Sequence, residues 1–367
     1  MAKDYEFEIN EQTLETILSL KNQMGYSEKT WDQWFTQIVN LFKKTKKDQS
    51  ILENAFEKNY YKKNYENWVS YFALNLENIT KEHSARELDP TYKKGNKFLD
   101  NSAIVIGAGP SVKKNKHLEL LASSDYKGSI ICTDRMLEPI LKAGITPDKF
   151  PKFYVATIDP AELLKKFYED PIITKYGNKI NGIFSTVVHP NIVGNARKAG
   201  IKIHWIHSLF DYNEGKKSFN QISALMVRAK NHKDGLPAIQ TGGNVGTASW
   251  FIAWKILKCN VVGLIGMNHG WDDDDDWDEI LAHSNAPSNI NRDSDEFKKL
   301  YPRIYNPDYD CYGIQDPTYQ YYCNATKEFI KRSPENIKTI NATEGGSLFG
   351  EKILSTTLKK FLKEYQK

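Results

Sequence analysis

A short glycine turn offers the first chemistry in this sequence. Gly107 and Gly109 stand in the run Gly-Ala-Gly-Pro-Ser that ends at Ser111, directly after an apolar stretch. Glycine lets a backbone turn tightly and approach a ligand, and Pro-Ser is typical of a helix start, where N–H groups can bind phosphate. The third glycine of a dinucleotide-binding fingerprint is absent, because Val112 stands there. The turn therefore indicates a phosphate site, and an ordinary strand-to-helix turn explains it equally well.

Two aspartates stand where the next two predicted strands end. Asp134 follows a strand predicted over residues 130–132, and Asp159 ends one predicted from residue 153. Carboxylates at neighbouring strand ends can hold Mg²⁺ or the hydroxyl groups of a ribose. We therefore predict both aspartates as metal ligands and catalytic residues, and Asp134 also as a ligand contact. Helix capping is the alternative, above all for Asp159, which precedes Pro160.

Two further turns rich in small residues could hold phosphate or sugar groups. The first lies before an apolar helix and offers Thr241, Gly242, Gly243, Asn244 and Thr247, with Asn244 placed as a cap. The second offers Thr343, Glu344, Gly345 and Gly346. More than one such turn on a single sheet favours a nucleotide as the ligand. For the first turn, the alternative is a helix start whose small residues only permit close packing. For the second, it is an ordinary loop.

Polar residues after a later apolar strand complete the candidate site. Asn268 is predicted to contact the nucleotide, and His269 to transfer protons. Residues 272–276 are all aspartate and could gather divalent cations, although a run of like charge is usually a solvated loop. A lone histidine often only packs, and we expect this of His204 and His207.

These residues need a framework that brings them together. From residue 102 onward, short apolar strands alternate with helical segments, which is typical of an α/β fold with a Rossmann-like, doubly wound and mainly parallel sheet. Strands are predicted over residues 103–106, 130–132, 153–158, 183–188, 202–206 and 261–265, and helices over 118–122, 137–143, 161–168, 192–199 and 245–257. Ligands of such sheets bind beyond the carboxyl ends of the strands, where the polar residues above are predicted to lie.

Three regions are predicted along the chain. Residues 1–98 form a helical region with apolar residues at helical spacing, and the polar run 89–96 separates it from the nucleotide-binding domain over residues 99–283. Residues 284–367 are predicted to be an irregular and helical extension, a lid that ends in a helix over residues 353–361. Tyrosines between residues 301 and 322 could stack on a flat substrate.

Composition excludes several classes of partner. The 50 Lys and Arg residues balance 46 Asp and Glu residues, so that a net charge of +4 indicates no nucleic-acid surface. The four cysteines form no Cys-x-x-Cys pair, and the sequence has neither a secretion leader nor an apolar run of membrane-spanning length. We expect a cytoplasmic protein with reduced thiols and leave open whether it forms a homo-oligomer.

In their order along the chain, these motifs resemble the MptE-like superfamily, which includes archaeal 6-hydroxymethyl-7,8-dihydropterin diphosphokinases and bacterial motility accessory factor glycosyltransferases. The resemblance lies in residues 104–111, 133–134 with 141–148, 158–159, 243–248 and 263–268. One departure matters. The last of these segments often ends in Gly-x-Asp in the family, whereas Asn268 stands here, and an amide brings no charge to Mg²⁺.

The resemblance implies a nucleotide-dependent transferase and leaves three functions open. The first is ATP- and Mg²⁺-dependent diphosphoryl transfer to the pterin, with Mg²⁺ held by Asp159 and Asp134. The second is a glycosyltransferase of the motility accessory type that uses a CMP-activated acidic sugar. Residues 341–346 favour it, because they resemble a segment of that branch and could hold the donor through Thr343 to Gly346. The third is a nucleotide-binding protein that has lost catalysis, which Asn268 motivates.

Overall fold

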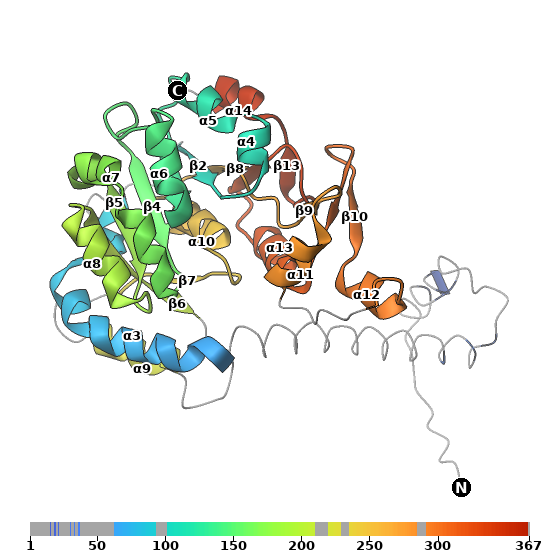
Figure 1. Cartoon of the computed structure of the whole chain (residues 1–367), viewed down its shortest axis with the longest axis horizontal. Helices are drawn as coiled ribbons and strands as arrows, with labels where there is room; N and C mark the ends of the chain where they lie inside the picture. The colour runs from blue at the N-terminus through green and yellow to red at the C-terminus, as the bar shows by residue number, and fades with distance from the viewer. Residues whose placement is uncertain are drawn as a thin grey trace, which may run out of the picture. The chain divides into compact units, whose positions relative to one another are not determined.

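The computed structural model describes residues 62–92, 101–209, 219–228, 235–284 and 291–365, with isolated positions between residues 15 and 36. The chain divides into two compact units, Met1–Ala55 and Phe56–Lys367. Most of the helices predicted before residue 45 lie outside the described residues. The second unit contains the whole framework described below (Figure 1).

One large parallel sheet forms the centre of this unit. Its strands are β1 (His83–Ser84), β2 (Ser102–Ile106), β3 (Ser129–Thr133), β4 (Phe153–Thr157), β5 (Asn181–Ser185), β6 (Lys202–Leu209), β7 (Ala238–Gln240), β8 (Val261–Ile265), β12 (Lys338–Asn341) and β13 (Ile353–Ser355). Their order is β1-β6-β5-β4-β3-β2-β8-β12-β13, with β7 also paired to β6. All six strands predicted from the sequence are present, within a few residues of their predicted bounds.

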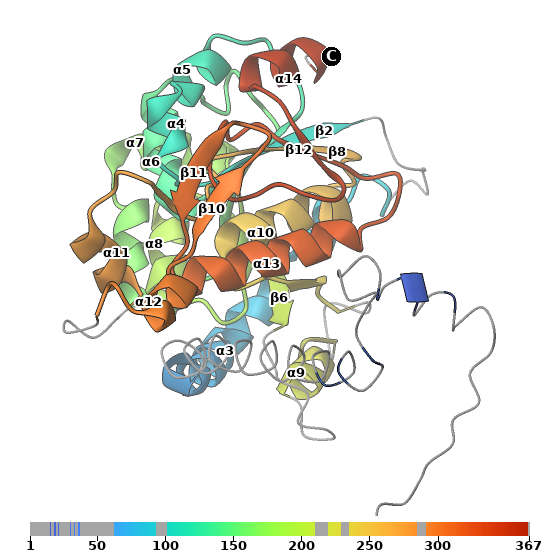
Figure 2. The same cartoon turned by 90° about the vertical axis from the view of Figure 1, so that its right-hand side faces the viewer.

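Helices cover both faces of the sheet, as the two views in Figure 1 and Figure 2 show. The helical segments are α3 (Lys62–Lys81), η2 (Ala85–Leu88), α4 (Ser111–Lys114), α5 (His117–Ala122), α6 (Asp134–Lys142), η3 (Glu162–Tyr168), α7 (Pro171–Tyr176), η4 (Gly177–Lys179), α8 (Pro190–Lys198), α9 (Phe219–Arg228), α10 (Val245–Phe251), the π-helical turn η6 (Ile252–Ile256) and α14 (Leu358–Tyr365). The Rossmann-like α/β fold predicted from the sequence is confirmed.

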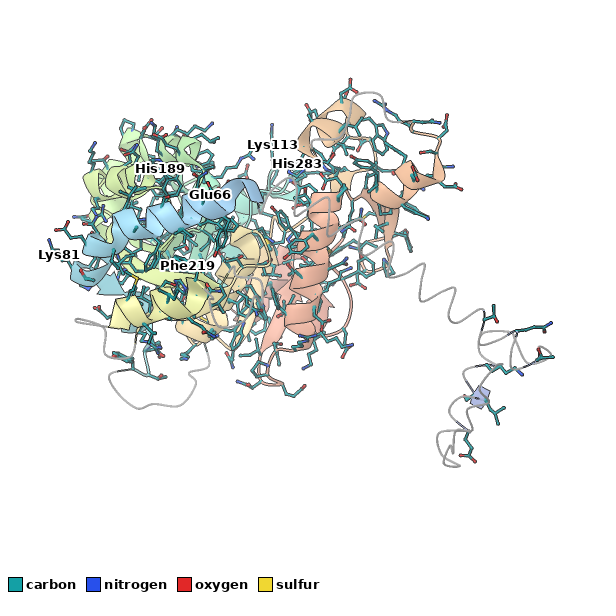
Figure 3. All side chains as sticks on the ribbon, turned by 90° about the horizontal axis from the view of Figure 1, so that it is seen from below. Glu66, Lys81, Lys113, His189, Phe219 and His283 are labelled. Atoms are coloured by element: carbon teal, nitrogen blue, oxygen red, sulfur yellow. The ribbon has the colours of Figure 1, made fainter. Side chains whose placement is uncertain are left out.

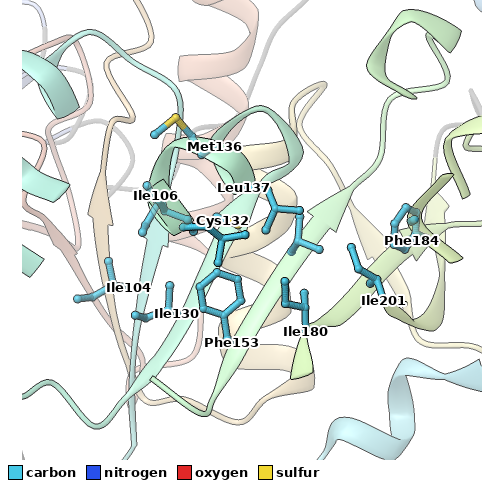
Figure 4. Close-up of a cluster of buried hydrophobic side chains, with 14 of the residues drawn as sticks. Ile104, Ile106, Ile130, Cys132, Met136, Leu137, Phe153, Ile180, Phe184 and Ile201 are labelled. Carbon is cyan, nitrogen blue, oxygen red and sulfur yellow. The ribbon is translucent and has the colours of Figure 1, made fainter. Parts of the chain in front are cut away.

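Side-chain alternation along the strands builds one hydrophobic core on each face. Ile104 and Ile106 of β2 join the first core, together with Ile130 of β3 and Phe153 of β4 (Figure 4). The neighbouring Ala103 and Val105 of β2 join the second core, beneath Trp250 of α10. Both faces of the central strands are buried, which explains why these strands are continuous apolar runs in the sequence.

The part of the chain after Gly270 is more regular than the sequence indicates. An antiparallel sheet joins β10 (Arg303–Asn306), β11 (Cys311–Ile314) and β9 (Trp271–Asp272), with α11 (Trp277–His283), α12 (Asp295–Leu300) and α13 (Pro317–Lys331) around it. Strands β12 and β13 then extend the main sheet beyond β8. The helix predicted over residues 353–361 is therefore wrong in its first half, because Ile353–Ser355 pairs with β12 and the helix begins only at Leu358.

The strand order reverses at β2, and this reversal positions the candidate site. From β2 the chain adds β3, β4, β5 and β6 on one side, whereas β8 and β12 lie on the other. Such a switch point opens a crevice beyond the carboxyl ends of the two strands that flank it.

None of the helices in the part of the chain that the structure describes has an apolar stretch of membrane-spanning length.

Candidate functional site

The glycine turn after β2 packs against the loop after β8. Gly107 N donates to Ile265 O at 2.8 Å, and Gly109 N donates to Gly266 O at 2.9 Å. A Cβ on Gly107 would stand 2.5 Å from Gly266 O, and one on Gly109 would overlap the Asn268 side-chain oxygen. Both glycines are therefore required for the close approach of the two loops, which is an explanation that needs no ligand.

Ser111 and Asn268 meet across this contact. The Ser111 hydroxyl donates to Asn268 Oδ1 at 2.8 Å, and both side chains are buried. The amide oxygen of Asn268 thus serves as an acceptor where the family often has a carboxylate. Two residues predicted from separate motifs are brought together by the switch point.

A cavity of about 190 Å³ lies beside this pair. It is lined by Ser111, Lys114, Asn268, Asp272, Asp273, Asp274, Cys311, Tyr312, Glu344 and Gly345. The cavity therefore joins the glycine turn, the loop after β8, the acidic run and the turn after β12, which are far apart in the sequence. Tyr312 adds an aromatic wall from the tyrosine-rich segment.

The acidic run is largely paired within the protein. Lys114 Nζ donates to Asp272 Oδ2 at 2.9 Å, and Arg303 forms two bonds of 2.6 and 2.7 Å to Asp273, which lower the pKa of that carboxyl. Asp276 caps α11. Within the described ranges, no group of three or more His, Cys, Asp or Glu side chains is arranged to hold a metal ion. The structure thus places these carboxylates in ion pairs and a helix cap.

Asp134 is the buried carboxylate of the site. Its Oδ1 accepts the Arg135 N–H at 2.7 Å, whereas Oδ2 is buried without a hydrogen-bond partner. Burial is the largest cause, and together with the negative charge of Asp159 it raises the pKa of Asp134 to about 7. A buried carboxylate with one unsatisfied oxygen is costly, and a bound cation would compensate it.

Asp159 lies at the end of the neighbouring strand, β4. It is half-buried, and its Oδ1 accepts the Ala161 N–H at 2.8 Å, so that it also closes a local turn. The two aspartates are close enough for their charges to act on each other, as their places on adjacent strands predict. Mg²⁺ is typically held by one or two carboxylates, with substrate phosphates and water completing its shell. Asp134 and Asp159 fit that pattern.

The turn before α10 connects to the aspartates through Tyr322 of α13. Asn244 caps α10 by accepting the Thr247 N–H at 2.8 Å, and the Thr247 hydroxyl bonds that of Thr326 at 2.5 Å. Tyr322 packs so tightly on Gly243 that a Cβ there would overlap its ring. Burial raises the pKa of Tyr322 first, and the charge of Asp159 raises it further. The turn of residues 241–247 thus positions α13, whose Tyr322 is within reach of the charge of Asp159.

The turn after β12 is tied to the switch point on two sides. The Met267 N–H donates to the Thr343 hydroxyl at 3.2 Å, and Ser347 N donates to Asn268 O at 2.8 Å. Glu344 Oε1 accepts the Leu358 N–H at 2.9 Å and lies 3.2 Å from His117 Nε2. Glu344 therefore braces α14 and α5 while it lines the cavity.

The two glycines of this turn differ in their surroundings. Gly346 lies against the Asn268 backbone, so that a Cβ there would overlap it, whereas a Cβ on Gly345 would meet no atom within 4 Å. Gly345 is thus the member of the turn that leaves open space on the cavity side.

His269 is buried in an unusual state. Its φ of 46° lies in the left-handed region, and neither ring nitrogen has a hydrogen-bond partner. Burial, followed by the charge of Lys327, lowers the pKa of His269 to about 4. The ring is therefore neutral at physiological pH. His204 and His207 are both buried, and His207 bonds Thr186 and Ser223, in keeping with the structural role predicted for them.

The comparison with protein families decides the wider assignment. The family described as 6-hydroxymethylpterin diphosphokinase MptE-like matches residues 70–274. The chain belongs to the MptE-like family. The superfamily resemblance inferred from the motifs is thereby confirmed. No curated protein matches the chain.

Two solved structures are similar to this MptE-like chain in part. The structure of the MAf glycosyltransferase from Magnetospirillum magneticum AMB-1 has 14% identity and a TM-score of 0.49, covering 70% of this chain and 34% of that one. A truncated 3-deoxy-D-arabino-heptulosonate 7-phosphate synthase from Thermotoga maritima has 11% identity and a TM-score of 0.22, covering 46% of this chain and 76% of that one. This chain thus spans about a third of the length of the glycosyltransferase.

The sequence motifs missed several residues of the site in this family member. Lys114 and Tyr312 line the cavity, and Tyr322 lies close enough to Asp159 for that charge to raise its pKa. For Tyr312 and Tyr322, the high density of tyrosines before residue 323 was the only indication in the sequence. Lys114 lies one helical turn beyond Ser111, a spacing that alone has no chemical signature.

Proposed function

We propose that this protein transfers a diphosphoryl group from ATP to 6-hydroxymethyl-7,8-dihydropterin in a Mg²⁺-dependent reaction. The observation that carries the proposal is the carboxylate pair at the ends of β3 and β4, in which the buried Asp134 has an unpartnered oxygen and a raised pKa beside the half-buried Asp159. Membership of a family described by this activity supports the choice of reaction. The nucleotide would lie at the switch point, over Gly107 to Ser111, with Gly242 and Gly243 near its other end.

The reaction needs positioning and neutralisation of charge more than covalent chemistry. The hydroxymethyl oxygen of the pterin attacks the β-phosphorus, the bond from that phosphorus to the oxygen bridging the α-phosphate breaks, and AMP leaves. Asp134 and Asp159 would hold Mg²⁺, which when bound neutralises phosphate charge. Tyr312 offers a ring on which the pterin could stack.

A glycosyltransferase that uses a CMP-activated acidic sugar is the second candidate. It is favoured by one observation, namely that Glu344 and Gly345, from the segment resembling the motility accessory branch, line the same cavity as Ser111. The proposed nucleotide site is shared by both candidates, so that the donor base and the acceptor distinguish them.

A thermal-shift panel tests these proposals. ATP, CMP, a CMP-activated acidic sugar and the pterin are each added with and without Mg²⁺, and a ligand of the native state raises the melting temperature. Stabilisation by ATP with Mg²⁺, followed by pterin-dependent release of AMP, is the expected result. Stabilisation by CMP compounds and not by ATP would refute the kinase and favour the second candidate. Binding without turnover would leave a binding protein that has lost catalysis.

Asp159→Ala sharpens the test of the metal site. The variant should lose the stabilisation by Mg²⁺ with ATP, because one of two proposed ligands is gone. Asp170→Asn is the control, since Asp170 caps α7 and pairs with Lys142 on the surface. Unchanged dependence on Mg²⁺ in Asp159→Ala would remove that residue from the metal site.

A further inference from the structure

A histidine and an aspartate outside all of the predicted motifs form a closely bonded pair. His283, the last residue of α11, has its Nδ1 2.5 Å from Oδ2 of Asp316, the residue that caps α13. Asp316 is completely buried and also accepts the N–H groups of Trp271 Nε1 at 3.2 Å and Tyr319 at 2.8 Å. An ionised carboxylate can only accept hydrogen bonds, so that Nδ1 carries the proton and Nε2 of a neutral ring carries the lone pair.

The ring of His283 is fixed in place and partly exposed. It stacks on Tyr319 with 4.8 Å between ring centroids and 19° between planes, and it meets the edge of Trp271 at 5.4 Å. Its side chain is 36% exposed, although its partner Asp316 is not exposed at all. This is the arrangement of a general base whose second nitrogen is oriented by a carboxylate.

Neighbouring residues link the pair to two parts of the candidate site. Trp271 is adjacent in the chain to Asp272, which lines the cavity. On the other side, Tyr319 lies close enough to Arg135 for charge to act between them, and it contacts Tyr322, on which Asp159 acts in turn. Figure 3 labels His283 near the start of α13, which Asp316 caps.

We propose that His283 is the general base that accepts the proton of the acceptor hydroxyl, and that Asp316 is its positioning residue. The proposal rests on the proposed transferase function and holds for either candidate, because each acceptor is an alcohol. As the acceptor oxygen bonds to phosphorus or to the sugar carbon, its proton moves to Nε2. The resulting imidazolium is stabilised by Asp316, and the proton passes to solvent after the product leaves. His269 cannot replace it, because its ring is buried.

The test compares His283→Ala with His83→Ala. His83 is the matched control, since its Nδ1 lies 2.8 Å from Glu87 and it packs at the β1 end of the sheet. Nucleotide affinity is measured by calorimetry. Release of AMP or CMP from the donor is measured with the pterin and with water alone as acceptor, so that the assay does not depend on one acceptor.

We expect His283→Ala to bind nucleotide within about twofold of wild type and to lose roughly 10²–10⁴-fold in turnover. Added imidazole should restore part of that turnover, and His83→Ala should behave as wild type. Wild-type turnover in His283→Ala, or no rescue by imidazole, would overturn the role of His283 while the transferase function stands. If the wild-type protein binds no nucleotide or never breaks down a donor, the proposed transferase function fails. The role proposed for His283 then fails as well.

Discussion

The difference in free energy of unfolding between Asp134→Asn and the wild type should depend on pH. It should shift in favour of the variant as the pH rises from acidic to alkaline values. In the folded protein, burial raises the pKa of Asp134 from 3.8 to about 7. Between these values the folded state keeps a proton that the unfolded state has lost. Stability from this group is therefore complete below pH 3.8, decreases as the pH rises, and reaches its lowest level above pH 7.

The magnitude follows from the two pKa values. The interval from 3.8 to about 7 corresponds to ~4 kcal/mol at 1.36 kcal/mol for each pKa unit. Of this loss of stability in the wild type, ~2–3 kcal/mol occurs between pH 5 and pH 8. Asparagine has no charge to bury and retains an oxygen for the Arg135 N–H, so that the variant lacks the pH-dependent part.

Urea unfolding of both proteins at pH 5, 6, 7 and 8 measures this difference. Groups other than Asp134 cancel when the free energy of unfolding of the wild type is subtracted from that of the variant at each pH. Asp170→Asn is the control. Lys142 holds the pKa of Asp170 below its usual value, so that the same subtraction should be flat over this range. A flat difference for Asp134→Asn would refute the argument that the carboxylate is buried and uncompensated.

Three further substitutions test the site, and the first has a control in α8. Gly109→Ala should lower the free energy of unfolding in urea by roughly 1–3 kcal/mol, because the new Cβ overlaps Asn268. Gly194→Ala is the control: no atom lies within 4 Å of its Cβ, so that it should stabilise α8 by about 0.5–1 kcal/mol. Asn268→Asp keeps the acceptor for Ser111 and adds a charge, so that the thermal shift produced by ATP should depend more strongly on Mg²⁺; equal dependence would exclude Asn268 from the metal site. Glu344→Ala leaves the Leu358 N–H and His117 without their acceptor and should lower the free energy of unfolding by about 1.5–3 kcal/mol. An unchanged melting temperature would contradict this prediction.

The main sheet could be predicted from the sequence because its central strands are buried on both faces. Continuous apolar runs such as Val261–Ile265 have no other common explanation between turns. Strand β12, in contrast, contains Thr339 and Asn341, which are polar and yet completely buried. Trp250 Nε1 donates to the Thr339 hydroxyl, and Asn341 donates to Leu348 O. Such long-range partners leave no periodic signal, so that β12 was missed.

The candidate site divides in the same way. The closeness of Asp134 and Asp159 follows from parallel strands alone, because the carboxyl ends of neighbouring strands meet at one edge. The pairing of His283 with Asp316 does not, since they are 33 positions apart in the sequence, with two strands of a separate antiparallel sheet between them. Residues positioned by strand order can be predicted from a sequence, whereas those positioned by the packing of the extension cannot.

Because β12 pairs with β8, the family-matched segment is not a self-contained body. A fragment that ends at residue 274 would keep β8 and lose its parallel neighbour. The backbone N–H and C=O groups of Val261–Ile265 would then form an exposed strand edge with apolar side chains on both faces. Such an edge is a template for pairing with other chains. The last ninety or so residues therefore cover this edge of β8, and fragments cut at the family boundary should aggregate.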